Sequence, residues 1–145
     1  METIVIIGAG ASGLACMNEL VKTNKYNIIV LEQSIKAARK ILASGNGRCN
    51  VSNLNMDIKY YNHQDPLIEK LIKEFDVVNF FKQLSLKLRY EKNLVYPYSL
   101  SSLSVKNVLM KNMDNVSYID NCEVLAIKKA KTYEIITTNG HYQAD

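Results

Sequence analysis

Three glycines and one acidic residue near the N-terminus have the types and the spacing needed to hold a dinucleotide. Gly8-Ala9-Gly10-Ala11-Ser12-Gly13 matches G-x-G-x-x-G, and Glu32 lies 19 residues after Gly13. In such a turn the first glycine permits a sharp bend, the second lets the backbone approach a pyrophosphate, and the third allows close helix packing. A carboxylate following the next strand accepts hydrogen bonds from ribose hydroxyls and repels a 2′-phosphate. The pattern predicts binding of FAD or NAD, and the alternative is a tight turn followed by a solvent-facing glutamate.

A strand, a helix and a second strand are expected around this turn. Residues 3–7 form a short apolar, β-branched run that stops at Gly8, which predicts a strand covered on both faces. Residues 27–31 predict a second buried strand, which ends just before Glu32. Residues 12–23 have the periodicity of an amphipathic helix. The first 32 residues therefore predict a βαβ unit, with the glycine turn at the start of its helix.

The apolar stripe of that helix also predicts which of its side chains enter the core. The stripe consists of Leu14, Cys16, Met17, Leu20 and Val21. We therefore expect Cys16 to be buried and Asn18 to lie outside the apolar face.

The remaining sequence predicts further helices and strands in an order that suits one mixed domain. Residues 33–55 have no clean period and predict a long loop. The expected helices are 66–75, 77–84 and 102–113, and the expected strands are 86–91, which is half-exposed, 94–97, 116–119, 123–128 and 133–138. Asn139-Gly140 is a strong hairpin signal, and the chain ends at Asp145, just after the return strand begins.

Composition and charge narrow the classes of protein. The chain has 145 residues, 48% hydrophobic and 22% charged, which is typical of one globular domain. Its net charge of +4 is spread along the sequence, which argues against a nucleic-acid partner. Cys16, Cys49 and Cys122 are far apart and form no C-x-x-C, so we expect no metal site and no disulfide scaffold. The absence of a signal peptide or a membrane span in this sequence favours a cytoplasmic protein without a membrane partner.

A second motif separates FAD from NAD. The run Arg39-Lys40-Ile41-Leu42-Ala43-Ser44-Gly45-Asn46-Gly47-Arg48-Cys49-Asn50-Val51-Ser52-Asn53 resembles R-K-[IL]-L-x-S-G-x-G-R-C-N-x-[ST]-N. Together with the N-terminal glycine turn, this motif is similar to that of bacterial FAD-dependent oxidoreductases of the aminoacetone-oxidase-like NAD(P)/FAD-dependent family. The segments 94–99 and 137–145 resemble later parts of the same family, so the likeness covers essentially the whole chain.

The resemblance implies a fold and an extent. It implies an α/β, Rossmann-like FAD/NAD(P)-binding fold with a parallel sheet, a helical and hairpin insertion at 57–100 and an antiparallel β-meander. Members of this family are much longer, so we expect residues 1–145 to be the N-terminal portion of such a protein, incomplete at the C-terminus.

The resemblance also assigns cofactor-binding residues. Around the glycine turn these are Gly8, Ala9, Gly10, Ala11, Ser12 and Gly13, with Glu32 and Gln33 after the second strand. Along the inner loop they are Lys40, Ser44, Gly45, Gly47, Arg48, Cys49 and Asn50, and a meander strand adds Val124. Arg48 has a physical reason, because a fixed guanidinium neutralises phosphate or an anionic reduced flavin. The alternatives are an exposed loop arginine at position 48 and a simple core residue at position 124.

Two positions depart from the family pattern. Family members commonly have glycine at the place of Ala38, and again at the place of Asn46. Asparagine tolerates a positive φ better than most residues, so the second change is mild.

The function implied by the resemblance is that of an FAD-dependent oxidoreductase acting on a small-molecule substrate, with this chain supplying the ADP- and pyrophosphate-binding half of the FAD site. NAD(P)H is a candidate electron donor, and no catalytic residue is assigned. Two alternatives stay open: an NAD-binding Rossmann module without flavin, and a truncated non-catalytic remnant that needs a partner chain.

Overall fold

The computed structural model describes residues 1–145 and divides them into two compact units. The first unit consists of Met1–Ile41 and Leu109–Asp145, and the second consists of Leu42–Val108. The segment 57–100, expected from the sequence to be an insertion, falls entirely within the second unit. None of the helices has the length and apolar character needed to cross a membrane.

A parallel sheet organises the first unit. Its strands are β1 (Glu2–Ile7), β2 (Tyr26–Leu31) and β6 (Ser117–Ile119), in the order β1-β2-β6. Helix α1 (Ala11–Thr23) connects β1 to β2, and the two strands pair in parallel from Glu2 opposite Tyr26 to Ile7 opposite Leu31. The expected strand, helix and strand are therefore confirmed, and so is the parallel sheet.

Two side chains of α1 are placed differently from the expectation. Cys16 is exposed, whereas Asn18 is fully buried beside Leu14. The Asn18 amide nitrogen donates hydrogen bonds of 2.7 Å to the carbonyl oxygens of Leu14 and Leu109, and its oxygen accepts one of 2.9 Å from Asn112. A buried amide is tolerated when its polar atoms are paired, so these bonds explain why the prediction from the apolar stripe was wrong.

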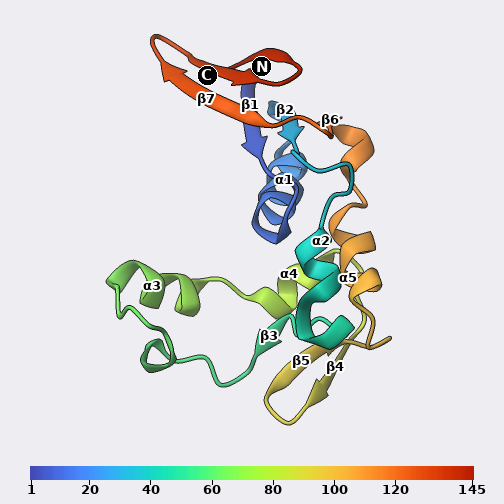
Figure 1. Ribbon diagram of the computed structural model, residues 1–145. Helices are drawn as coiled ribbons and strands as arrows, with labels where there is room; N and C mark the ends of the chain where they lie inside the picture. Colours follow the sequence, from blue (N-terminus) through green and yellow to red (C-terminus); the bar gives the residue numbers. More distant parts are fainter. The chain divides into compact units, whose positions relative to one another are not determined.

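An antiparallel meander covers the parallel sheet within the first unit. It consists of β7 (Val124–Lys129), β8 (Tyr133–Thr137) and β9 (Gly140–Ala144), and Asn139-Gly140 makes the expected turn. Leu31, Cys122 and Ile135 form a buried cluster shared by the parallel sheet and the meander. The end of the meander returns to β1, where the Asp145 amide donates a 3.1 Å hydrogen bond to the Thr3 carbonyl oxygen, so the two termini lie together (Figure 1).

The second unit carries short elements around a three-stranded antiparallel sheet. Its strands are β3 (Ser52–Asn53), β5 (Leu94–Pro97) and β4 (Leu88–Glu91), in the order β3-β5-β4. The other elements are the 3-10 turns η1 (Ser44–Gly47) and η2 (Ile58–Tyr60) and the helices α3 (Pro66–Glu74) and α4 (Val77–Gln83). The helices α3 and α4 begin where aspartates cap them, since Asp65 accepts from the Leu67 amide and Asp76 from the Asn79 amide.

Two boundaries differ from the expectation. The segment 33–55 is not a plain loop, because it contains the five-residue helix α2 (Arg39–Ala43) together with η1 and β3. Helix α5 (Ser102–Leu109) ends four residues earlier than expected, and η3 (Met113–Asn115) follows it. Elements this short carry too few periodic positions for a sequence pattern to detect.

Candidate functional site

The glycine turn and Glu32 lie side by side at the carboxyl ends of the parallel strands. Gly8 follows β1 and donates a 2.7 Å hydrogen bond to the carbonyl oxygen of Leu31, the last residue of β2. Glu32 follows β2 and donates a 2.9 Å backbone hydrogen bond to the carbonyl oxygen of Ile119 in β6. Ligands of open α/β sheets bind at this edge, so the structure brings the two sequence features to the same place.

Each glycine of the turn meets a different structural demand. Gly8 has φ +94°, a conformation that residues with a Cβ rarely adopt. A Cβ on Gly13 would overlap the carbonyl oxygen of Gly8 and crowd Ile6 at 3.2 Å. At Gly10 the backbone is extended and a Cβ would meet no protein atom within 4 Å. The fold therefore explains Gly8 and Gly13 but gives Gly10 no reason, whereas a ligand in the open space beside it would.

The start of α1 is suited to an anion. Its N-cap is Gly10, no side chain caps it, and no acidic residue lies in its first turn. Ala11 and Ser12 are exposed there. The helices α3 and α4 differ, since aspartates cap both. Because the first amides of a helix and its dipole attract negative charge, a diphosphate fits this N-terminus.

Glu32 is bound into the turn but keeps acceptor capacity. Its Oε2 accepts a 2.7 Å hydrogen bond from the Ala9 amide, and its Oε1 accepts one of 2.9 Å from the Ser34 amide. Each carboxylate oxygen has a further lone pair, so the half-buried group still accepts from ribose hydroxyls. Ala9 itself is fully buried, and Gln33 is exposed beside the carboxylate. The residues present therefore fit the adenosine diphosphate part of FAD.

Glu32 and Asp120 both lie close enough to Tyr118 to act on its phenol. Burial raises the pKa of the Tyr118 phenol, and the charges of Asp120 and Glu32 raise it further. Two carboxylates near one point disfavour an additional phosphate, and the exclusion of a 2′-phosphate stays a prediction.

Ala38 ties the segment that follows Glu32 to the glycine turn. The Ala38 amide donates a 2.9 Å hydrogen bond to the Ala9 carbonyl oxygen, and Ala38 is buried with φ +62°. The left-handed backbone explains the glycine that family members commonly have at this place. Lys40, two residues later on α2, is exposed.

Six expected cofactor residues lie in the second unit, in a strained loop around η1, namely Ser44, Gly45, Gly47, Arg48, Cys49 and Asn50. Four of the five residues at positions 45–49 have a positive φ, among them Asn46 at +54° and Cys49 at +54°. The bend is closed by hydrogen bonds of 3.1 Å from the Cys49 amide to the Ser44 carbonyl oxygen and from the Arg48 amide to that of Gly45. Cys49 is buried, and the Asn50 side chain accepts from the Ser52 amide. Strain of this kind is typical of ligand-binding loops.

Arg48 extends from this loop to the β4–β5 hairpin. Its Nη1 lies 3.6 Å from Glu91 Oε2, and its Cζ lies 5.0 Å from the centre of the Tyr96 ring. Glu91 belongs to no sequence motif and is one of the polar positions of the half-exposed strand expected at 86–91. Its only sequence signal is its place next to the hairpin turn at Lys92-Asn93.

Val124 gives weaker support for a cofactor contact than the residues above. Val124 is half-buried against the cluster of Leu31, Cys122 and Ile135, a core position, and its expected contact with cofactor stays a prediction.

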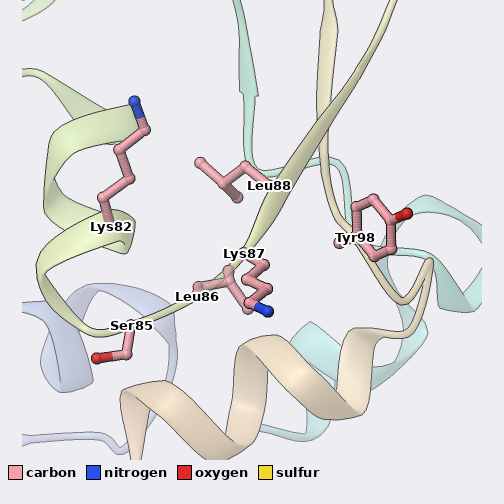
Figure 2. A pocket seen from close by; sticks show the side chains of 6 residues that line it. All are labelled: Lys82, Ser85, Leu86, Lys87, Leu88 and Tyr98. Atoms are coloured by element: carbon pink, nitrogen blue, oxygen red, sulfur yellow. The ribbon is translucent and has the colours of Figure 1, made fainter.

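An open cavity in the second unit contains none of the expected cofactor residues. It is lined by Lys82, Ser85, Leu86, Lys87, Leu88 and Tyr98. Figure 2 shows that their polar tips point apart rather than toward one point, so we do not treat this cavity as the site.

Comparison with families and curated proteins gives consistent matches. The family described as "HI0933-like protein Rossmann domain" matches residues 2–145. A 3-dehydro-bile acid delta(4,6)-reductase of Clostridium scindens is 32% identical over 153 residues, which cover 100% of this chain and 37% of the relative. A ribosomal RNA dihydrouridine synthase of Escherichia coli is 29% identical over 143 residues, which cover 94% of this chain and 35% of the relative. The chain thus spans a little over a third of the length of these proteins.

Solved structures with the same fold include a flavocytochrome and a protein in complex with FAD. Thermovibrio ammonificans THI4 matches with a TM-score of 0.64 at 10% identity, over 99% of this chain and 53% of that one. A flavocytochrome c3 fumarate reductase matches with 0.62 at 14%, over 98% and 32%. CtdE in complex with FAD matches with 0.55 at 12%, over 100% and 37%. At these identities the likeness shows the fold alone.

Proposed function

The chain belongs to the HI0933-like protein Rossmann domain family, and from this premise we propose that it supplies the ADP- and pyrophosphate-binding half of the FAD site of an FAD-dependent oxidoreductase. The observation that carries the proposal is the open space at Gly10 beside the uncapped start of α1, with the Glu32 carboxylate fixed next to it. A diphosphate fits the amides and the adenosine ribose fits the carboxylate.

Each group of residues has a defined task in this proposal. The amides at the start of α1 bind the diphosphate, and the bare backbone of Gly10 allows it to approach. Glu32 accepts from the ribose hydroxyls while its bonds to the Ala9 and Ser34 amides keep the carboxylate in place. The loop around Arg48 contributes positive charge to an anionic part of the cofactor. When bound, FAD supplies the hydride chemistry, which the protein orients and tunes.

The names of the two relatives indicate the direction of the reaction. One is a delta(4,6)-reductase and the other a dihydrouridine synthase, and both names describe the addition of hydrogen. We therefore propose that the protein adds hydrogen to its substrate, with NAD(P)H as the electron donor. A small-molecule substrate, as in the name of the bile acid reductase, stays a prediction. The finer kinship with aminoacetone-oxidase-like proteins stays a prediction.

Nucleotide binding tests the proposal. FAD, NAD and NADP are titrated into the protein, and the flavin is followed by the quenching of its fluorescence and by the colour retained after desalting. We expect FAD to bind best, and Gly10→Ala to weaken FAD binding about tenfold or more, because a methyl group displaces phosphate from charge-assisted hydrogen bonds to backbone amides.

The same substitution separates binding from folding. An extended backbone with free space accepts a methyl group sterically, so Gly10→Ala should lower the free energy of unfolding by no more than about 1 kcal/mol, the ordinary cost of alanine at a helix N-cap. Glu19→Ala, on the exposed face of α1, is the control and should change neither quantity. Preference for NAD over FAD, or protein that stays colourless after FAD loading, would favour the NAD-binding module instead.

A further inference from the structure

The guanidinium of Arg48 is held between a ring and a carboxylate. Tyr96 is only 5% exposed, so the ring that lies 5.0 Å from Arg48 Cζ is fixed in the core of the second unit. On this ring the guanidinium gains a cation–π contact, which restrains its plane but not its direction along the ring. The contact with Glu91 at 3.6 Å supplies the missing restraint.

Glu91 is itself held from its other side. Its Oε1 lies 3.2 Å from Arg89 Nη2, so one carboxylate bridges two guanidinium groups. Glu91 sits at the end of β4, paired with Leu94 across the hairpin turn. Because Arg89 and the paired strand already restrain it, the Glu91 side chain loses less freedom on binding Arg48 than a free glutamate does.

The backbone of the loop is docked on the same hairpin. The Val51 amide donates a 2.9 Å hydrogen bond to the Val95 carbonyl oxygen, and the Leu54 amide donates one of 2.7 Å to that of Asn93. The β4–β5 hairpin therefore holds both the backbone just after Arg48 and the Arg48 side chain.

We propose that Glu91 is a positioning residue that holds the Arg48 guanidinium in one direction on the β4–β5 hairpin, so that it binds the anionic part of the flavin cofactor. The proposal rests on the proposed function, since it needs Arg48 to contact FAD. Glu91 acts through Arg48, because a carboxylate has no favourable contact of its own with an anionic ligand.

The sign of one substitution distinguishes positioning from simple charge. If Glu91 only added negative charge near the ligand, Glu91→Gln would strengthen FAD binding. If Glu91 positions Arg48, the same change frees the guanidinium and weakens binding, by about two- to fivefold for a partly exposed ion pair. We expect weakening in Glu91→Gln, and a smaller loss in Glu91→Asp, which keeps the carboxylate.

The experiment measures FAD dissociation constants for the wild type, Glu91→Gln, Arg48→Gln and the double variant. In the Arg48→Gln background, Glu91→Gln should have no further effect, because the positioned group is gone. Glu69→Gln, which removes an exposed carboxylate paired with Lys73 on α3, is the control for net charge and should leave FAD binding unchanged.

A second readout needs no cofactor. In 15N-labelled protein without FAD, the Nε–Hε signal of Arg48 should have a high heteronuclear NOE that falls in Glu91→Gln but not in Glu69→Gln. Unchanged mobility of Arg48, or tighter FAD binding by Glu91→Gln, would overturn the inference. If the wild type binds no FAD at all, the proposed function fails, while the NMR result still decides whether Glu91 fixes Arg48.

Discussion

Ala38 carries backbone strain at the point that ties the chain to the glycine turn. Its φ of +62° lies in the left-handed region, which costs a residue with a Cβ roughly 1–2 kcal/mol. Its amide is bonded to Ala9 and its side chain is buried, so the conformation is imposed by its surroundings. The family resemblance marks this place as one where glycine is common, and the structure supplies the reason.

Removing the Cβ should therefore stabilise the protein. We expect Ala38→Gly to raise the free energy of unfolding by about 1 kcal/mol, because relief of the left-handed strain exceeds the entropy that glycine adds to the unfolded chain. Ala37→Gly is the matched control: Ala37 is equally buried but has no positive φ, so its replacement should lower stability by about 0.5–1 kcal/mol. Urea unfolding of both variants decides, and a loss of stability in Ala38→Gly would contradict the argument.

At the scale of elements, Asn18 links α1 to the end of α5 and to the residues just after it. Its three hydrogen bonds join it to Leu14, Leu109 and Asn112 with no exposed area. Asn18→Ala leaves the Leu109 carbonyl oxygen and the Asn112 amide without this partner, so we expect a loss of about 2–3 kcal/mol in the free energy of unfolding.

The neighbouring residue provides the comparison. Glu19 is exposed on the same helix, and Glu19→Ala should change the free energy of unfolding by no more than about 0.5 kcal/mol. Thermal and urea unfolding of both variants test the difference. Equal, small effects would show that the buried amide is dispensable.

Local rules account for the elements that the sequence predicts well. The strand, glycine turn and helix at the N-terminus depend on neighbouring residues, and so do the aspartate caps of α3 and α4 and the Asn139-Gly140 turn. The burial of Asn18 and the contact of Glu91 with Arg48 depend on partners far along the chain. No local pattern signals such pairs, so the helical periodicity predicts Asn18 outside the core and the sequence gives no sign of the contact between Glu91 and Arg48.

At the scale of the whole molecule, the parallel sheet leaves one long strand at its edge. In the order β1-β2-β6, strand β1 pairs with β2 on one side only. On its other side the structure shows contact near Thr3, where Asp145 exchanges hydrogen bonds through its amide and its carboxylate. The apolar strand beyond Thr3 is therefore open to pairing, and Ile7 at its end is 49% exposed. Open edges of this kind promote association with another strand.

We therefore expect the 145-residue polypeptide to associate through β1 as its concentration rises. Sedimentation over a range of concentrations should show a growing oligomeric fraction, and Ile7→Lys should reduce it, because an edge lysine opposes strand pairing. Ile35→Lys removes an equally apolar side chain that is 73% exposed but lies outside any strand, so it should leave the association unchanged. A concentration-independent monomer with a cooperative melt would show that the edge is protected, and equal effects of the two lysines would point to general hydrophobicity instead of strand pairing.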